Sequence, residues 1–150
     1  MDWITQAAKA REDRRLRREA IERDAAALWE KIRGTVEQAV NDYEAIAERP
    51  RHAKLGGRTA HALHVAIFEK RAQGMQVARV AIILDRKQNM VEIRTAVGGV
   101  GRKFPIGLTH DGRACLMSEG HEIPLEEFSK AALSDLFFPQ EEATSADVEE

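Results

Sequence analysis

The residues best placed for chemistry in this chain are a group of glycines followed by two cations. They are Gly98, Gly99 and Gly101, and then Arg102 and Lys103. Glycines let backbone N–H groups approach an anion, and the two basic side chains would neutralise its charge. A phosphate loop or a dinucleotide site, however, needs a helix to begin directly after the glycines. Here a strand containing Pro105 is expected, so the pattern favours a hairpin connection or a bulge over a phosphate site.

The single cysteine and the histidines show no pattern typical of catalysis or of metal binding. Cys115 has no second cysteine with which to form an internal disulfide or a multi-cysteine metal site. It falls in an expected strand, where a buried cysteine acts as a small apolar residue. His61 and His64 are three residues apart, which places them on opposite faces of a strand. His110 and His121 lack a nearby cysteine or carboxylate cluster. We therefore predict no catalytic residue, no metal site and no cofactor.

The segment best suited to face an anion is a basic loop expected at residues 49–58. Its four cations, with no acidic residue among them, are Arg49, Arg51, Lys54 and Arg58. Together with Arg102 and Lys103 they form a candidate anion-binding set. No aromatic residues alternate with them for base stacking, so sequence-independent contact with phosphates is the most that this set supports. The net charge of −2 also argues against a dedicated nucleic-acid-binding protein.

The first structural element is a long helix, expected from near Trp3 to near Ala47. Along its second half, apolar residues recur at spacings of four and three, which places them on one face. This apolar stripe consists of Ala25, Trp29, Ile32, Val36, Ala39, Tyr43 and Ile46. Toward the N-terminus, the same face carries Ile21, Arg18, Arg14, Arg11, Ala7 and Trp3. Because arginines replace the aliphatic residues of a core-facing helix, residues 1–24 are expected to form a charged helical arm.

The arm has two interpretations. Oppositely charged residues four apart can support an exposed helix, so the arm can be a solvated element. Alternatively, its arginine stripe docks an acidic partner or a nucleic-acid backbone, with Trp3 and Ile4 as an apolar anchor.

Five strands are expected between Pro50 and Pro124. They are His61–Lys70, Gln76–Asp85, Met90–Val97, Arg102–Leu108 and Arg113–Met117. They follow one another through short polar turns, which is typical of an antiparallel meander. A second helix should follow Pro124, since Leu125, Phe128, Ala132 and Leu136 recur at helical spacing. The fold class is therefore α+β, with both helices on the sheet face of Leu63, Val65 and Ile67. Residues 25–138 form one domain, and residues 139–150 form a disordered acidic tail.

The other face of the first two strands carries an unusual number of apolar residues. This sheet-face patch consists of His64, Ala66, Phe68, Val77, Ala81 and Ile83. Such a patch on a solvated sheet is typical of an interface. A homodimer is the simplest assembly that would cover it. The alternative is that residues 51–58 or the start of the long helix fold over the patch.

Composition narrows the class of protein. A chain of 150 residues with 43% apolar and 32% charged residues is typical of a globular domain. The lone cysteine and the lack of a long apolar run favour the cytoplasm and exclude membrane association. We expect a small non-catalytic binding or adaptor protein that acts as a homodimer. The alternatives are a weak, sequence-independent nucleic-acid or anion binder using residues 49–58, and a small-ligand carrier or enzyme with a pocket between sheet and helix.

Overall fold

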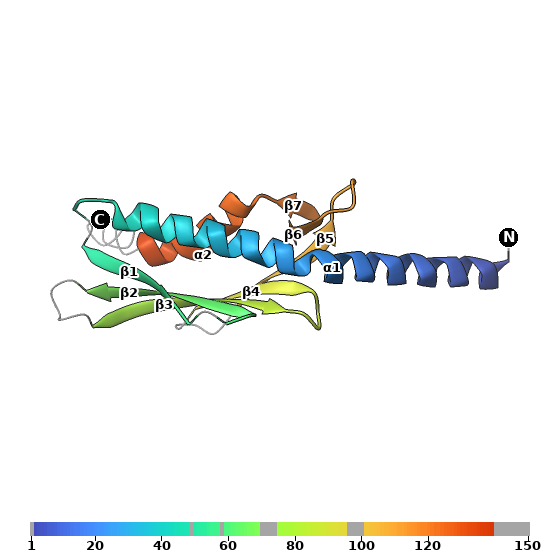
Figure 1. The fold of residues 1–150 in the computed structure, drawn as a ribbon, viewed down its shortest axis with the longest axis horizontal. Coiled ribbons are helices and arrows are strands. Elements are labelled where there is room, and N and C mark those ends of the chain that lie inside the picture. Colours follow the sequence, from blue (N-terminus) through green and yellow to red (C-terminus); the bar gives the residue numbers. More distant parts are fainter. Residues whose placement is uncertain (1, 49, 58, 70–74, 96–100, 140–150) are drawn as a thin grey trace, which may run out of the picture.

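The protein combines two helices with one antiparallel sheet. The computed structural model describes residues 2–48, 50–57, 59–69, 75–95 and 101–139. In chain order the elements are α1 (Trp3–Glu44), β1 (Arg51–Gly56), β2 (Ala62–Glu69), β3 (Gln76–Asp85), β4 (Met90–Thr95), β5 (Arg102–Leu108), β6 (Ala114–Ser118), β7 (His121–Ile123) and α2 (Leu125–Phe137). Each strand pairs antiparallel with its neighbour in sequence. Figure 1 shows both helices on the same side of β1–β4. The expected α+β fold, with an N-terminal helix, an antiparallel sheet and a C-terminal helix, is confirmed.

Within the described residues the sheet has seven strands, so the expectation of five is wrong. The segment from Arg51 to Gly56, expected as a loop, is the edge strand β1 and pairs with β2. Its alternation of apolar and polar residues was hard to detect, because only two apolar residues, Ala53 and Leu55, face the helices. The segment from His121 to Ile123, which is not among the five expected strands, is β7, and it follows β6 through a tight turn. Three residues are too few for an alternation to stand out.

Pro105 lies where β5 changes its neighbour. The first half of β5 pairs with β4, ending where Met90 lies opposite Pro105, and the second half pairs with β6 from Ile106 onward. Proline has no N–H to donate to a ladder, so it is tolerated where pairing changes. Pro105 therefore marks a change of partner within a strand that has neighbours on both sides.

The core lies between the sheet and the inner faces of the two helices. Leu63, Ile82 and Ile93 face one another across three strands and are almost fully buried. Phe104 of β5 meets Phe128 of α2 edge to face, with ring centroids 5.1 Å apart. This contact fixes α2 against the second half of the sheet.

The apolar stripe of α1 supplies the other wall of the core. Five of its members are buried, and Ile21, Leu28 and Val40 widen the buried face. The stripe ends earlier than expected, because α1 stops at Glu44 and Ile46 lies beyond it with 43% of its surface exposed. Helix termination thus precedes Pro50 by several residues.

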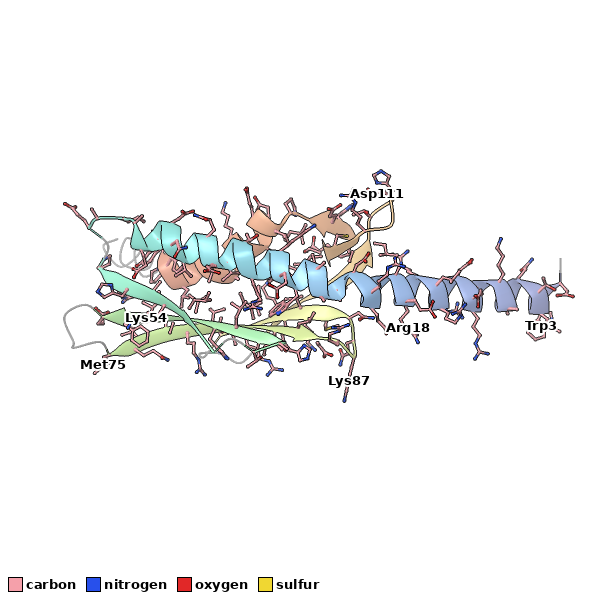
Figure 2. All side chains as sticks on the ribbon, viewed as in Figure 1. Trp3, Arg18, Lys54, Met75, Lys87 and Asp111 are labelled. Atoms are coloured by element: carbon pink, nitrogen blue, oxygen red, sulfur yellow. The ribbon has the colours of Figure 1, made fainter. Side chains whose placement is uncertain are left out.

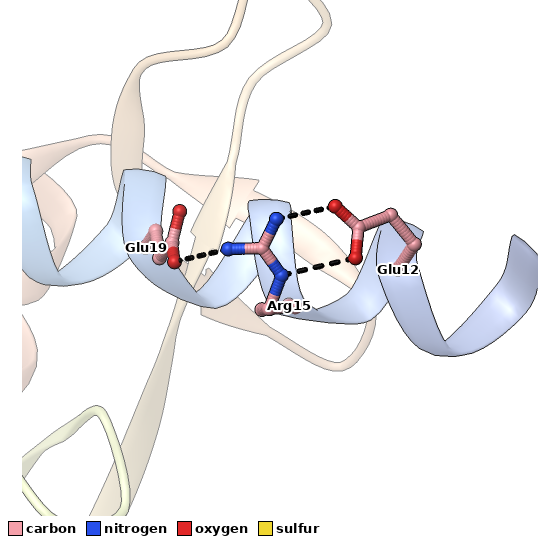
Figure 3. Close-up of polar contacts among 3 residues, drawn as sticks. All are labelled: Glu12, Arg15 and Glu19. Atoms are coloured by element: carbon pink, nitrogen blue, oxygen red, sulfur yellow. Dashed lines mark hydrogen bonds and ion pairs between the residues drawn. The ribbon is translucent and has the colours of Figure 1, made fainter. Parts of the chain in front are cut away.

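The N-terminal half of α1 leaves the domain and projects from it (Figure 1). Every residue from Asp2 to Glu19 is exposed, and Ile21 is the first buried residue of the helix. Figure 2 shows Trp3 near the tip and Arg18 close to where the helix enters the domain. Arg15 donates hydrogen bonds to Glu12 and Glu19, one turn away on either side (Figure 3). This local network supports a stretch of helix that has no core to pack against.

Candidate functional site: a groove between the two helices

A groove of about 930 Å³ runs between α1 and α2. Its larger apolar residues are Tyr43, Ile46, Leu125, Leu133, Phe137 and Phe138. On α2, every fourth residue from Leu125 through Ser129 and Leu133 to Phe137 lines it. Because residues four apart lie above one another on a helix, they form one continuous wall. The other wall comes from the face of α1 next to its buried stripe.

Small residues keep the groove open on the α1 side. Gly34, Thr35 and Ala39 line it in successive turns. At Gly34 a Cβ atom would meet no other atom within 4 Å, so there is free space beside the backbone. Glycine inside a helix costs about 0.5–1 kcal/mol relative to alanine. Gly34 therefore lowers the stability of the helix at this turn and leaves room for another side chain.

Aromatic residues line one open end of the groove. Tyr43 and Phe137 stack with ring centroids 4.4 Å apart, and Phe138 meets Tyr43 edge to face at 6.1 Å. Phe138 is nevertheless 63% exposed, and Ile46 beside it on the groove lining is 43% exposed. Large apolar side chains left open at the end of a groove mark a contact surface.

Charged residues lie on the rim and not on a closed floor. They are Lys31 and Asp42 on α1, and Glu126 and Lys130 on α2, and all four are exposed. An apolar floor with a polar rim is the arrangement by which grooves hold amphipathic helices.

The structure does not bring the candidate anion-binding residues together. Arg51 forms an ion pair with Glu69 at 3.0 Å, and the Lys54 ammonium lies 5.2 Å from the centre of the Phe68 ring. Arg102 and Lys103 are on β5, which three strands separate from β1. Arg49 and Arg58 lie outside the described residues. Binding of an anion by this set stays a prediction.

The glycine group is followed by a strand and not by a helix, since β5 begins at Arg102. Gly98 and Gly99 lie outside the described residues. At Gly101, an added Cβ atom would lie 2.8 Å from a carboxylate oxygen of Glu92. A carboxylate this close repels an approaching phosphate, which argues against an anion site at Gly101.

The sheet-face patch lies on the side of the sheet away from the helices. Most of its members are half-buried, and Val77 is 40% exposed. Charged side chains interrupt it, since Lys54 and Arg79 lie opposite Ala66 on the two neighbouring strands. His64 lies beneath Gly57, where an added Cβ atom would come within 2.2 Å of the histidine Cδ2 atom. Dimerisation through this face stays a prediction.

Cys115 is buried and its Sγ atom lies 3.6 Å from the Sδ atom of Met117. Burial raises the pKa of its thiol, with a further contribution from Glu122. A thiol held in its neutral form is a poor nucleophile. Across the part of the chain that the structure describes, no three His, Cys, Asp or Glu residues are grouped so as to hold a metal ion.

No protein-family model, no curated protein and no solved structure matches this chain. Within the described residues, no helix has the length and apolar character needed to cross a membrane.

The sequence did not reveal the groove, although it contained one signal. Leu133 and Phe137 extend the spacing of four that begins at Leu125, next to the core stripe of Phe128, Ala132 and Leu136. Two adjacent apolar stripes on one short helix indicate two packing surfaces. The α2 wall of the groove could have been found in this way. The α1 wall could not, because it consists of small and polar residues that give no apolar signal.

Proposed function

We propose that this protein is a non-catalytic binding protein whose groove between α1 and α2 holds an amphipathic α-helix of a protein partner. The observation that carries the proposal is the groove itself, with its apolar walls, its exposed aromatic end and its charged rim. From Lys31 to Tyr43 its α1 wall extends about 18 Å, the length of more than three helical turns, and Ile46 continues the lining beyond the end of α1. This shape suits a helix better than a compact ligand.

The charged residues of the groove support recognition more than proton transfer. Lys31, Asp42, Glu126 and Lys130 are exposed on the rim. Catalytic acids and bases work best when they converge on one desolvated point. A small-ligand site between sheet and helix is less favoured, since the groove is lined by α1, α2 and the residues that follow them.

The test is selection of binders from a phage-displayed library of 18-residue amphipathic helices, with the full-length protein immobilised at low density. Selected peptides should bind the wild type and lose at least about tenfold in affinity on Thr35→Trp, which fills the centre of the groove. Ala27→Trp is the matched control, because Ala27 is exposed on α1 outside the groove. Selected peptides that bind both variants equally well would place the binding site elsewhere and overturn the proposal.

A further inference from the structure

The projecting half of α1 resembles a segment that a partner covers. We refer to residues 3–18 as the docking helix. Its tip carries Trp3 and Ile4, which are 75% and 61% exposed. An isolated helix of this length is only marginally stable in water, and exposed tryptophan and isoleucine on a charged helix mark a contact surface.

The docking helix and the surroundings of the groove carry opposite charge. Residues 3–18 contain six basic and two acidic residues, a net charge of +4. The four charged residues that line the groove, Lys31, Asp42, Glu126 and Lys130, balance one another. The acidic excess lies around them, since residues 30–44 and 125–137 together contain seven acidic and three basic residues, a net charge of −4. Arg11, Arg14 and Arg18 form no ion pair with any described residue, whereas Arg15 is held by Glu12 and Glu19. Complementary charge of this kind guides association and selects the partner.

The docking helix also matches the groove in length. From Trp3 to Arg18 it extends about 23 Å, and the helical wall of the groove extends about 18 Å from Lys31 to Tyr43, with Ile46 beyond it. Its apolar tip would meet the open aromatic end of the groove if the two helices ran antiparallel. Its arginines would then lie toward the end of the groove where α2 begins, near Glu126 and the neighbouring Glu127.

The groove cannot receive the docking helix of its own chain. α1 is one continuous helix from Trp3 to Glu44. The tip and Tyr43 are therefore about 60 Å apart along a single rod. A docking helix in the groove must come from another molecule.

We propose that the docking helix of a second copy fills the groove, in a two-fold dimer in which each copy holds the other. The inference rests on the proposed function, since it names the helix that the groove binds. In a dimer with a two-fold axis, the docking helix of each copy lies in the groove of the other copy. The same contact therefore forms twice. In this antiparallel arrangement Ile4 of one copy lies near Phe138 of the other.

The first test is the solution mass by light scattering at about 100 µM protein, well above the Kd of a stable dimer. The wild type should have the mass of a dimer, and Trp3→Glu with Ile4→Glu should halve it. Leu16→Glu is the matched control, because Leu16 is exposed on the opposite side of the docking helix. Thr35→Trp should also halve the mass, and Ala27→Trp should not.

The second test is a disulfide between positions 4 and 138. Chains carrying Ile4→Cys are mixed with chains carrying Phe138→Cys and oxidised mildly. The mixture should give a cross-linked dimer that contains one chain of each kind, while chains with Lys87→Cys in place of Phe138→Cys should give at least about tenfold less. Lys87 is an exposed control at the turn between β3 and β4 (Figure 2). Buried Cys115 should take no part.

Two results would overturn the inference. One is a wild-type monomer at this concentration. The other is a dimer that withstands the tip and groove variants and is separated by Phe68→Glu with Ile83→Glu, which would place the interface on the sheet-face patch. In either case the peptide selection, repeated on the tip variant, decides independently whether the groove binds a helix of a different protein.

Discussion

Tyr43 of α1 and Phe137 of α2 stack face to face, with ring centroids 4.4 Å apart and ring planes inclined by 13°. The tyrosine is buried, while Phe138, which meets it edge to face, is largely exposed. One tyrosine therefore joins the two helices and supports the open end of the groove. Aromatic pairs of this kind contribute about 0.5–1.5 kcal/mol beyond the burial of their area.

The stack gives a prediction on stability. Phe137→Leu should lower the free energy of unfolding by about 1–2 kcal/mol, since it removes the stacked pair and part of the buried ring. Phe138→Leu should cost less than about 0.5 kcal/mol, because that ring is mostly in solvent. Urea unfolding of both variants measures the difference. Equal losses would mean that the stack does not hold the helices together.

The two tryptophans should differ sharply in their contribution to stability. Trp29 is 3% exposed in the core, and Trp3 is 75% exposed on the docking helix. Trp29→Ala should cost about 3–5 kcal/mol through lost burial and a cavity, while Trp3→Ala should change stability by less than about 0.5 kcal/mol. Unfolding in dilute solution, below the concentration at which dimers form, is the measurement. A large loss for Trp3→Ala under these conditions would show that the tip packs against its own domain.

The start of α1 should depend on pH through one carboxylate. Asp2 is the N-cap and accepts a hydrogen bond from the Thr5 N–H at 2.7 Å, which lowers the pKa of its carboxyl from the usual 3.8. A pKa lowered by folding stabilises the helix end above the unfolded value, and this is lost as the pH falls through the folded value. Protection of the first turn against amide exchange, measured relative to an unfolded chain at the same pH, should therefore decrease below about pH 4.

Variants at the same position separate capping from charge. Asp2→Asn keeps an acceptor and should retain protection of the first turn at neutral pH, whereas Asp2→Ala should lose it. The melting temperature should hardly change in either variant, because the residues of this turn are exposed. Unchanged exchange in Asp2→Ala would contradict the role of the cap.

Two adjacent glycines should respond differently to alanine. Gly57 has φ +60° and a Cβ atom there would come within 2.2 Å of His64 Cδ2, while Gly56 has open space. Gly57→Ala should destabilise the protein by at least about 2 kcal/mol, from backbone strain plus displacement of the imidazole. Gly56→Ala should be nearly neutral. Thermal unfolding of the pair is the test, and a neutral Gly57→Ala would mean that His64 is free to move.

The thiol of Cys115 should react slowly. Because burial raises its pKa, alkylation by iodoacetamide at pH 8 should be at least about tenfold slower than for Lys87→Cys in a Cys115→Ala background. The raised pKa also has a consequence for stability. Above the usual value of 9.0 the unfolded thiol ionises first, so the protein should lose stability as the pH rises. Equal rates of alkylation would show that the thiol is accessible.

The sequence predicted the elements whose periodicity is long. The stripe of α1 and the alternation in β2 and β4 identified their buried faces, because burial selects apolar residues at the period of the backbone. It missed β1, whose inward residues include only Ala53 and Leu55 as apolar groups, and β7, which has three residues. Both segments form strands because a neighbouring strand supplies partners for their backbone hydrogen bonds. A local sequence pattern does not indicate that such a neighbour is present.

The groove could be predicted only in part for a related reason. The α2 wall has a periodic signal at Leu125, Leu133 and Phe137. The α1 wall depends on Gly34, Thr35 and Ala39, whose role is to leave space. The free space in the groove depends on how the two helices diverge, so no single segment of the sequence predicts it.

Because every strand pairs with the strand that follows it, the sheet can form by adding one hairpin after another. Contacts of this kind are local and form quickly. α1 has the opposite situation, since it is made first and, apart from β1, the elements that it packs against are β5, β6 and α2, which are synthesised some sixty residues later or more. During synthesis much of the apolar stripe of α1 thus remains exposed until the last elements are made. We expect the rate of productive folding to be set by the arrival of the last strands, and aggregation of nascent chains to begin from this one helix.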